Sequence, residues 1–498
     1  MCSFRHFPVL FLLFAATINS SILTASPWTS TENLRLRMDI QRLNDAGIIN
    51  IPATTWPILW ADVRHGLKGI IRISSKANIL QLDPSLQTSL RYVRKQLQEN
   101  TDVDLNASYR TTYRVFTANT GSLFNGYGRR VEQGEGINIT TESQADRFSA
   151  GLNLHYLNDP KDQKQWRLDG SYVATSIGNW NVSLSATDRW WGPGWQSSLI
   201  LSTNARPIPA LSFSRMVSYA PESKWLNWIG PWQMTAFMGA LENNRVIPNA
   251  KLWGMRISFK PFPGLELGLA RVAQLGGEGR SESLRSFAKS FLGKGENVAN
   301  DSGNQLGGLD ARYSWQLFSS SAALYGQLIG EDEAGYLPAK YIFLGGMEVS
   351  GVATEQGYLS IFIEYSDTLS GRIVGDARPN TAYEHHAYKS GYRYYGRPLG
   401  ASSDNDARTV TLGGMLIEQS GAIWTAALSQ LDLNTDSVAR ANQVSPTHHK
   451  MQHFMLSHKR QILAVMADFS VEWSSELPQT NLVGSDRFGV YAGIEYRM

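Results

Sequence analysis

Two stretches of the chain contain side chains that could bind a sugar polymer, and the longer one, between residues 378 and 398, is rich in arginine and tyrosine. An arginine guanidinium forms paired hydrogen bonds with a carboxylate, and a tyrosine ring offers a flat apolar face beside a polar tip. We predict that this stretch binds an acidic polysaccharide, or alternatively that it folds back to close an opening in the protein. The predicted ligand residues are Arg378, Tyr383, Tyr388, Tyr392, Arg393, Tyr394, Tyr395 and Arg397.

The second stretch places three tryptophans within six residues, beside a charged pair and a Gly-Pro-Gly turn. Indole rings could stack on sugar rings while the charged pair holds hydroxyl or carboxylate groups. The alternative is an aromatic cluster that fixes the interior of the fold. The residues concerned are Asp188, Arg189, Trp190, Trp191, Gly192 and Trp195.

Neither a catalytic nor a metal-binding site is predicted. The pairs His385–His386 and His448–His449 are adjacent, and neighbours in a strand point to opposite faces, so the second pair is poorly placed to chelate one metal. The sequence contains no H-E-x-x-H, G-x-S-x-G or phosphate-loop pattern. We therefore predict a protein without enzymatic activity or cofactor. A barrel hydrolase stays a third alternative, which requires a nucleophile and a base to meet at the rim.

Charge and composition favour a membrane-associated, β-rich chain. Lys+Arg is 46 and Asp+Glu is 43, which gives a net charge of +3, and no basic block occurs. This balance gives no support to nucleic-acid binding. Charged residues make up only 18% of the chain, whereas aromatic residues make up 11% and glycine occurs 44 times. Soluble domains carry more charge than this.

The first 25 residues are typical of a secretory signal peptide. Arg5 supplies the positive start, residues 9–16 form an apolar stretch, and Ala25 is small enough for a cleavage site. The apolar stretch is too short to span a membrane as a helix, and no later segment reaches 18 apolar residues. Cys2, the single cysteine, lies in this predicted signal. An exported chain of this composition without a spanning helix predicts a transmembrane β-barrel.

The periodicity of the chain changes near residue 102. Residues 26–101 show helical spacing, whereas residues 102–498 alternate apolar and polar side chains with a period of two. Eighteen alternating runs are predicted, an even number as in bacterial outer-membrane barrels. The runs are 103–115, 145–157, 165–175, 180–187, 197–204, 208–219, 232–242, 250–260, 264–275, 305–317, 320–331, 338–350, 356–368, 407–419, 421–433, 448–459, 462–473 and 486–498.

The lengths of the predicted connections give the barrel an orientation. Long connections alternate with short ones such as 260–264, 318–319 and 460–461. Outer-membrane barrels combine long outside loops with short periplasmic turns. We therefore predict an all-β fold, a transmembrane antiparallel barrel of about 18 strands preceded by a periplasmic helical segment. The same alternation of long and short connections places the tryptophan-rich stretch at the periplasmic or lumenal side, which favours its structural role. The long connections are 118–144, 276–304, 369–406, 434–447 and 474–485.

The chain resembles the Wzi-type capsule assembly family of outer-membrane proteins. The resemblance lies in the helical segment after the signal, in the Asp-Arg-Trp-Trp-Gly-Pro-Gly run at 188–194, and in the late loop with Tyr388, Gly391 and Tyr392. It implies an eighteen-stranded outer-membrane barrel with a small periplasmic helical bundle. It also implies lectin-like attachment of capsular polysaccharide or exopolysaccharide at the cell surface.

The sequence therefore predicts a non-enzymatic barrel of the cell outer membrane that anchors capsular polysaccharide or exopolysaccharide and aids capsule assembly. Outer-membrane lipid is a predicted partner, and polysaccharide export machinery is a further candidate. The alternative function is a passive diffusion channel for sugars or other small solutes. The state of the lumen distinguishes these two functions: a channel requires an open lumen, and the helical segment and the long loops could block it.

Overall fold

The computed structural model describes residues 26–73, 83–101, 109–128, 130–144, 147–282, 303–334, 337–371, 376–438 and 442–498. The predicted signal peptide and the first half of the predicted strand 103–115 lie outside the described residues.

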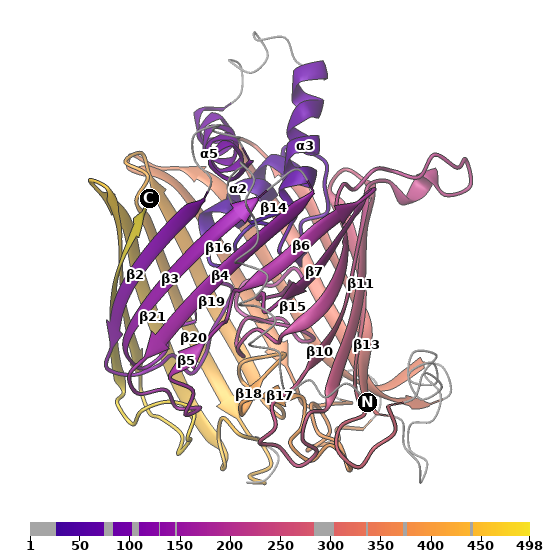
Figure 1. Cartoon of the computed structure of the whole chain (residues 1–498), viewed down its shortest axis with the longest axis vertical. Coiled ribbons are helices and arrows are strands. Elements are labelled where there is room, and N and C mark those ends of the chain that lie inside the picture. The colour runs from indigo at the N-terminus through magenta and orange to yellow at the C-terminus, as the bar shows by residue number, and fades with distance from the viewer. Residues whose placement is uncertain are drawn as a thin grey trace.

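The wall is a closed antiparallel β-barrel with eighteen strand positions in the described part of the chain (Figure 1). The barrel closes where β2 pairs with both β3 and β23, and β5 and β6 share one position because both pair with β4. The wall strands are β2 (Arg110–Ala118), β3 (Gly134–Gln144), β4 (Phe148–Leu157), β5 (Trp166–Arg167), β6 (Tyr172–Ile177), β7 (Trp180–Ser185), β9 (Ala210–Arg215), β10 (Trp232–Ala240), β11 (Lys251–Phe262), β12 (Leu265–Leu275), β13 (Asn304–Leu317), β14 (Ser320–Ala334), β15 (Leu337–Ala353), β16 (Gly357–Asp367), β19 (Arg408–Glu418), β20 (Ile423–Leu433), β21 (His449–Ile462), β22 (Val465–Ser474) and β23 (Phe488–Arg497).

Alternation along each strand separates a lipid-facing side from a lumen-facing side. On β16, Ile361 and Ile363 are exposed, whereas Phe362 and Glu364 are buried toward the lumen. Closure pairs the backbone amides between strands, so the wall can cross hydrocarbon without unpaired polar groups. The period of two in the sequence therefore encodes which side of each strand meets the membrane.

The predicted fold class is confirmed, but one wall strand, β3, was missed and one predicted strand, 197–204, is wrong. β3 was expected to be part of the connection 118–144, because its apolar face is weak, with only Ile137 and Ile139 exposed among polar residues. Residues 197–204 were expected in the wall, yet this apolar run is buried inside the barrel, where Leu201 bridges to Trp191. Because one strand was missed and one was added, the predicted number of wall strands stays the same. The two errors also reverse the expected direction of the strands between them.

The connection between β7 and β9 therefore leaves the end of the barrel that carries the long loops, and not the opposite end. We call these the long-loop end and the short-turn end. The turns 263–264, 318–319 and 463–464 define the short-turn end. The alternation of successive connections between the two ends of the barrel had placed the tryptophan-rich stretch on the periplasmic or lumenal side. The structure shows this stretch in the lumen, which it enters from the long-loop end.

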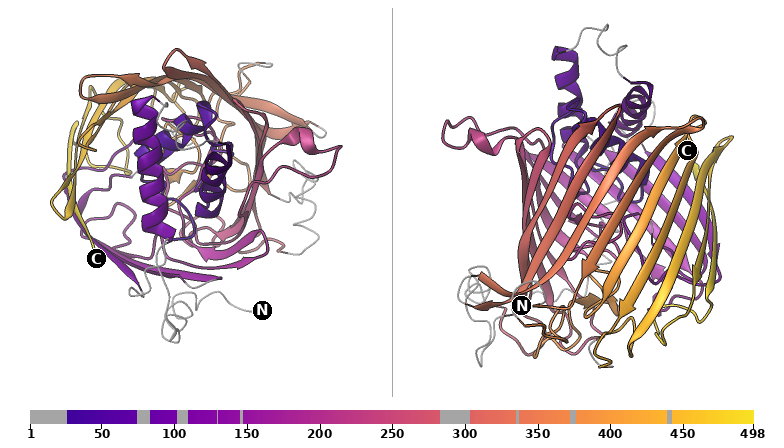
Figure 2. Two further views of the ribbon diagram at one scale, coloured as in Figure 1. Left: turned by 90° about the horizontal axis from the view of Figure 1, so that it is seen from above. Right: turned by 180° about the vertical axis from the view of Figure 1, so that it is seen from behind.

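The predicted helical segment is helical and sits at the short-turn end, partly inside the barrel outline (Figure 2). Its helices are α2 (Leu34–Asp45), α3 (Trp60–Ile73) and α5 (Pro84–Thr101). Asn33 caps α2 by accepting a hydrogen bond from the Leu36 amide at 3.0 Å. Among the described residues, no helix is long and apolar enough to cross a membrane.

Candidate functional site

Three segments far apart in the sequence fill the lumen. They are the helical segment, the tryptophan run (residues 188–205) and the mouth loop (residues 376–407). Together with inward-facing wall residues they form one buried core, which contains Met38, Trp191, Leu199 and Tyr383. The interior of the barrel is therefore packed by its own chain.

The tryptophan run is fixed to the helical segment by backbone pairing. Its strand β8 (Trp190–Trp191) pairs with β1 (Thr55–Trp56), and both indoles of β8 are fully buried. The Gly192 amide donates to the Thr54 carbonyl at 2.9 Å. These tryptophans therefore lack an exposed face on which a sugar ring could stack.

Arg37 of α2 joins the same two segments through its side chain. Its guanidinium carbon lies 4.2 Å from the Tyr127 ring centroid and 4.1 Å from that of Trp195. One terminal nitrogen donates to the carbonyls of Pro193 and Gly194, both at 2.8 Å. Burial lowers the pKa of Arg37 to about 10, so the guanidinium stays charged at neutral pH. A buried cation between two aromatic rings locks the run onto α2.

The charged pair that opens the run is also turned toward the protein. Asp188 lies 3.6 Å from Arg130, and burial raises the pKa of Asp188 to about 6. Arg189 donates to the Thr187 carbonyl at 3.0 Å and to the Ser212 hydroxyl at 2.9 Å. Both side chains therefore contact other parts of the chain.

The mouth loop turns three of its tyrosines into the lumen. Tyr383, Tyr388 and Tyr392 are buried, and each hydroxyl donates to a backbone carbonyl. The acceptors are Leu199 at 2.7 Å, Gly276 at 3.1 Å and Ile200 at 2.8 Å, in the same order. Because buried carbonyls need hydrogen-bond donors, Tyr383 and Tyr392 hold the loop against the tryptophan run, and Tyr388 holds it against the connection that follows β12.

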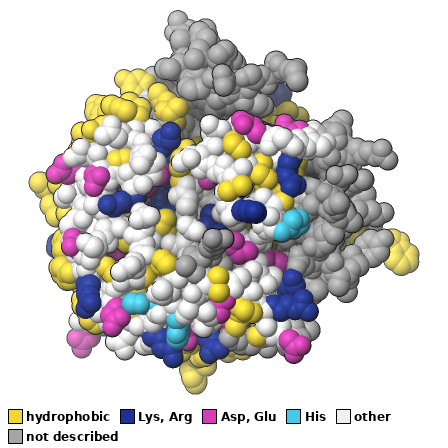
Figure 3. All heavy atoms as spheres, turned by 90° about the horizontal axis from the view of Figure 1, so that it is seen from below, with side chains coloured by type: hydrophobic (Ala, Val, Ile, Leu, Met, Phe, Trp, Pro, Cys, Tyr) yellow, Lys and Arg dark blue, Asp and Glu magenta, His cyan; other side chains and the backbone are white. Residues whose placement is uncertain are grey.

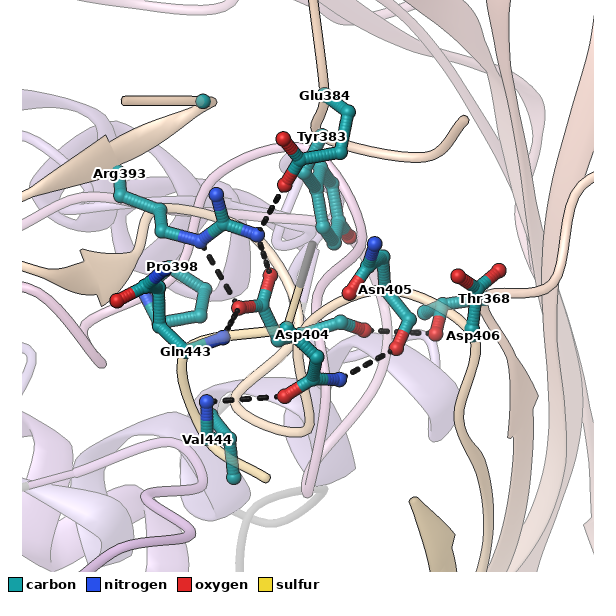
Figure 4. A network of polar contacts seen from close by, with 12 residues as sticks. Thr368, Tyr383, Glu384, Arg393, Pro398, Asp404, Asn405, Asp406, Gln443 and Val444 are labelled. Carbon is teal, nitrogen blue, oxygen red and sulfur yellow. Dashed lines mark hydrogen bonds and ion pairs between the residues drawn. The ribbon is translucent and has the colours of Figure 1, made fainter. Parts of the chain in front are cut away.

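Arg393 is the polar centre of the mouth loop (Figure 4). It lies in β17 (Arg393–Tyr394), which pairs with β18 (Arg397–Pro398). Its guanidinium donates to both carboxylate oxygens of Asp404, at 2.9 and 2.8 Å, and to Glu384 at 2.5 Å. Asp404 is fully buried and also accepts from the Gln443 amide at 2.9 Å. The bidentate pair therefore joins two parts of the mouth loop, and the Gln443 amide joins Asp404 to the next long loop.

The end of the loop contacts further segments at the mouth. Arg397 donates to the Ser122 carbonyl at 2.9 Å, and burial lowers its pKa to about 10. Tyr394 is buried next to Tyr395, with ring centroids 4.7 Å apart. Tyr395 is half-buried, and the guanidinium of Arg206 lies 4.9 Å from its ring centroid.

The predicted set of eight ligand residues does not form one exposed surface, and the alternative that the loop folds back into the opening describes most of its side chains. Five of its members are buried, because their polar atoms satisfy groups inside the barrel. Arg378 is exposed at the start of the loop, and Tyr395 and Arg397 are partly exposed. The buried members are Tyr383, Tyr388, Tyr392, Arg393 and Tyr394.

Sequence reasoning missed other exposed side chains of the mouth. His386 and Lys389 lie between the buried tyrosines of the same loop and face solvent. Sequence reasoning also missed Arg206, whose largely buried guanidinium lies 4.9 Å from the Tyr395 ring centroid and donates to Asp169 at 2.8 and 2.9 Å.

The long-loop end presents a polar surface with basic and acidic side chains interspersed (Figure 3). Within the described residues, no group of three or more His, Cys, Asp or Glu side chains is placed to hold a metal ion. The geometry of this face fits recognition of a polar ligand by hydrogen bonds, charge and a few aromatic edges.

A closed β-barrel with an apolar outer face and paired backbone groups throughout is a membrane-spanning barrel of the outer membrane. The model of the family described as capsule assembly protein Wzi matches residues 105–473, and the chain belongs to this family. The predicted resemblance and the outer-membrane location are thereby confirmed.

Two relatives support this assignment. Wzi of Escherichia coli, an outer-membrane protein described as a carbohydrate-binding β-barrel involved in group 1 capsule assembly, has a solved structure. It is 26% identical, with a TM-score of 0.77 over 96% of this chain and 99% of that chain. An uncharacterised 55.8 kDa protein of the cps region of Klebsiella pneumoniae is 32% identical over 317 residues. That match spans 63% of this chain and 60% of the Klebsiella protein.

Proposed function

We propose that this protein binds capsular polysaccharide or exopolysaccharide at the cell surface and aids capsule assembly without catalysing a reaction. The family membership supports this function, as does the carbohydrate binding described for the E. coli relative. In this proposal the long-loop end faces outside and the helical segment lies in the periplasm, as the loop lengths of outer-membrane barrels require. Export machinery is a further candidate partner at the short-turn end, where Arg91 and Lys95 of α5 are exposed.

One observation carries the proposal: the mouth loop is rigidly held from inside while it presents cations outside. Arg393 and the buried tyrosines fix the loop, and Arg378 and Lys389 project from it into solvent. A preformed surface loses little conformational entropy on binding. Each exposed contact with a carboxylate is weak, but a long polymer engages many copies of the protein at once.

The filled lumen disfavours the alternative of a passive diffusion channel. Barrels of this strand number conduct only when their interior is open. Here α2, the tryptophan run and the mouth loop pack into one core. A cavity of about 10 Å³ lies between α2, the tryptophan run and the wall, lined in part by Met38, Trp195 and Phe362, and it has room for about one water molecule.

We expect the double variant Arg378→Ala/Lys389→Ala to release acidic polysaccharide from cells into the medium, with unchanged total synthesis and barrel abundance. Both side chains are exposed, so their loss leaves the packing intact. Arg91→Ala/Lys95→Ala removes the same charge at the opposite end and is the matched control. Polysaccharide is measured in the cell-bound and medium fractions. Equal retention by both double variants would argue against this face as the binding surface.

A further inference from the structure

One connection at the short-turn end differs from its neighbours. Residues 216–231, between β9 and β10, form a long excursion that projects sideways from the barrel rim (Figures 1 and 2). The turns 263–264, 318–319 and 463–464 at the same end are tight. We call residues 219–231 the lateral hairpin.

The lateral hairpin exposes large apolar side chains at its tip. Trp225 is 88% exposed, Trp228 is 59% exposed and Leu226 is 48% exposed. They stand at or next to a short 3-10 turn, η2 (Asn227–Ile229). Contiguous exposed apolar side chains of this size mark an interaction surface, because water solvates them poorly.

The hairpin lies on the lipid side of the wall. Trp228 packs edge-on against Phe259 of β11, with ring centroids 6.3 Å apart. Phe259 points outward, because its neighbours Ser258 and Lys260 are buried toward the lumen. If the hairpin pointed into water, it would extend away from the outer face of β11 and would not pack against Phe259.

The apolar surface of the barrel extends to the level of the hairpin. Phe318 in its turn is 97% exposed, and Leu463 in its turn is 93% exposed. Phe262, at the end of β11, is 49% exposed. Because exposed apolar side chains occupy the turns themselves, the edge of the membrane lies at the short-turn rim, in the plane into which the hairpin projects.

The base of the hairpin is held in this direction. The Asp62 carboxylate of α3 accepts from the amide and the hydroxyl of Ser218, both at 2.8 Å, and from the Gln233 side chain at 2.8 Å. Arg215 donates to the Trp232 carbonyl at 2.6 Å and lies 3.9 Å from the Trp232 ring centroid. The helical segment and the wall therefore orient the hairpin together.

We propose that the lateral hairpin is an interfacial anchor that inserts Trp225, Leu226 and Trp228 between the headgroups and acyl chains of the periplasmic leaflet. Tryptophan is enriched at this depth of a membrane, and short apolar elements lie there parallel to the surface. Glu222 and Lys224 are the charged residues of the hairpin, and their charges cancel. Burial of apolar surface therefore drives the contact, and the partner is a phospholipid bilayer without a requirement for anionic headgroups.

The test uses the full-length protein with a fluorescent reporter at the tip. Cys2 is the only cysteine, so in a Cys2→Ser background either Trp225→Cys or Leu226→Cys gives a single labelling site. Each variant is labelled with the environment-sensitive dye NBD and reconstituted into phosphatidylcholine vesicles. Gln98→Cys, at an exposed position of α5, is the matched control. Both tip labels should show blue-shifted emission, strong quenching by doxyl-labelled lipid and protection from iodide, whereas the label at 98 should show the reverse.

A tip label that iodide quenches as strongly as the label at 98, and that doxyl lipid leaves unaffected, would overturn the proposal, because the tip would then lie in water. Protection of the tip label from both quenchers would also overturn it, because the tip would then be buried against protein. If the labels at positions 225 and 226 give the same result, that result is not a local effect of one substitution. The proposal rests on the outer-membrane location of the barrel and on the orientation given under the proposed function, and it is independent of polysaccharide binding.

Discussion

Deletion of residues 30–100 should leave an inserted barrel whose conductance is higher than that of the intact protein. The deletion removes the partners of several charges that face the lumen. Glu266 loses the amides of Ala53 and Thr54, each at 2.8 Å, and Arg312 loses Asp45, at 2.6 and 2.8 Å. These groups then take water as their partner, because an unpaired buried charge is strongly unfavourable. A hydrated barrel of this size conducts ions.

Planar-bilayer recordings of the purified variant measure this effect, after a heat-shift gel has shown that the barrel is folded. Arg91→Ala/Lys95→Ala, which keeps the helical segment in place, should conduct as little as the parent. The mouth loop stays in the deletion variant and limits the size of the current. If the folded deletion variant conducts no more than the parent, the helical segment does not plug the barrel.

Arg393→Ala should loosen the fold of the mouth loop, because both ion-pair partners of Arg393 belong to this loop. The substitution leaves Asp404 buried without its bidentate partner, and Glu384 also loses its ion pair. Breaking a buried ion pair by removing one partner costs about 3–5 kcal/mol. That cost corresponds to roughly a hundredfold or greater rise in the local opening equilibrium of the loop. Proteolysis of a transiently open segment follows this equilibrium when opening and closing are fast.

Digestion of intact cells with proteinase K measures the opening of the loop. Arg378→Ala is the matched control, because it removes the same side chain from the same loop at an exposed position. We expect it to change the stability of the loop by no more than about 0.5 kcal/mol. Arg393→Lys keeps the charge but loses the fork geometry, and its cleavage rate should fall between the two. Equal cleavage of Arg393→Ala and Arg378→Ala would show that Arg393 does not hold the loop.

The wall of the barrel was predictable from the sequence because the alternation of apolar and polar side chains within a single strand indicates which residues face lipid. Alternation within a strand such as β16 reports which side meets lipid, with Ile361 and Ile363 on one face. The prediction failed where a strand lacks apolar contrast, as in β3, and where an apolar run is buried by packing instead of by lipid, as at 197–204. A hydrophobic run alone does not distinguish burial in a membrane from burial in a plug.

The arrangement of the site was less predictable because it depends on contacts between distant segments. The residue types of the mouth loop indicate sugar binding, but the direction of each side chain is set by partners such as Leu199, Gly276 and Asp404. Tyr383 and Arg378 belong to one loop, yet one fills the lumen and the other faces solvent. Spacing within the loop carries no signal for this difference, because the loop has no regular secondary structure that repeats it.

Binding of polysaccharide by the purified protein tests the central claim most directly. The protein is reconstituted in lipid nanodiscs, immobilised, and exposed to the acidic surface polysaccharide of the cells that produce it. We predict binding that weakens with increasing salt, because screening reduces charge contacts at an exposed surface. We also predict that Arg378→Ala/Lys389→Ala greatly reduces this binding and that Arg91→Ala/Lys95→Ala does not. Absence of binding by the folded parent protein, or equal binding by both double variants, would contradict the account.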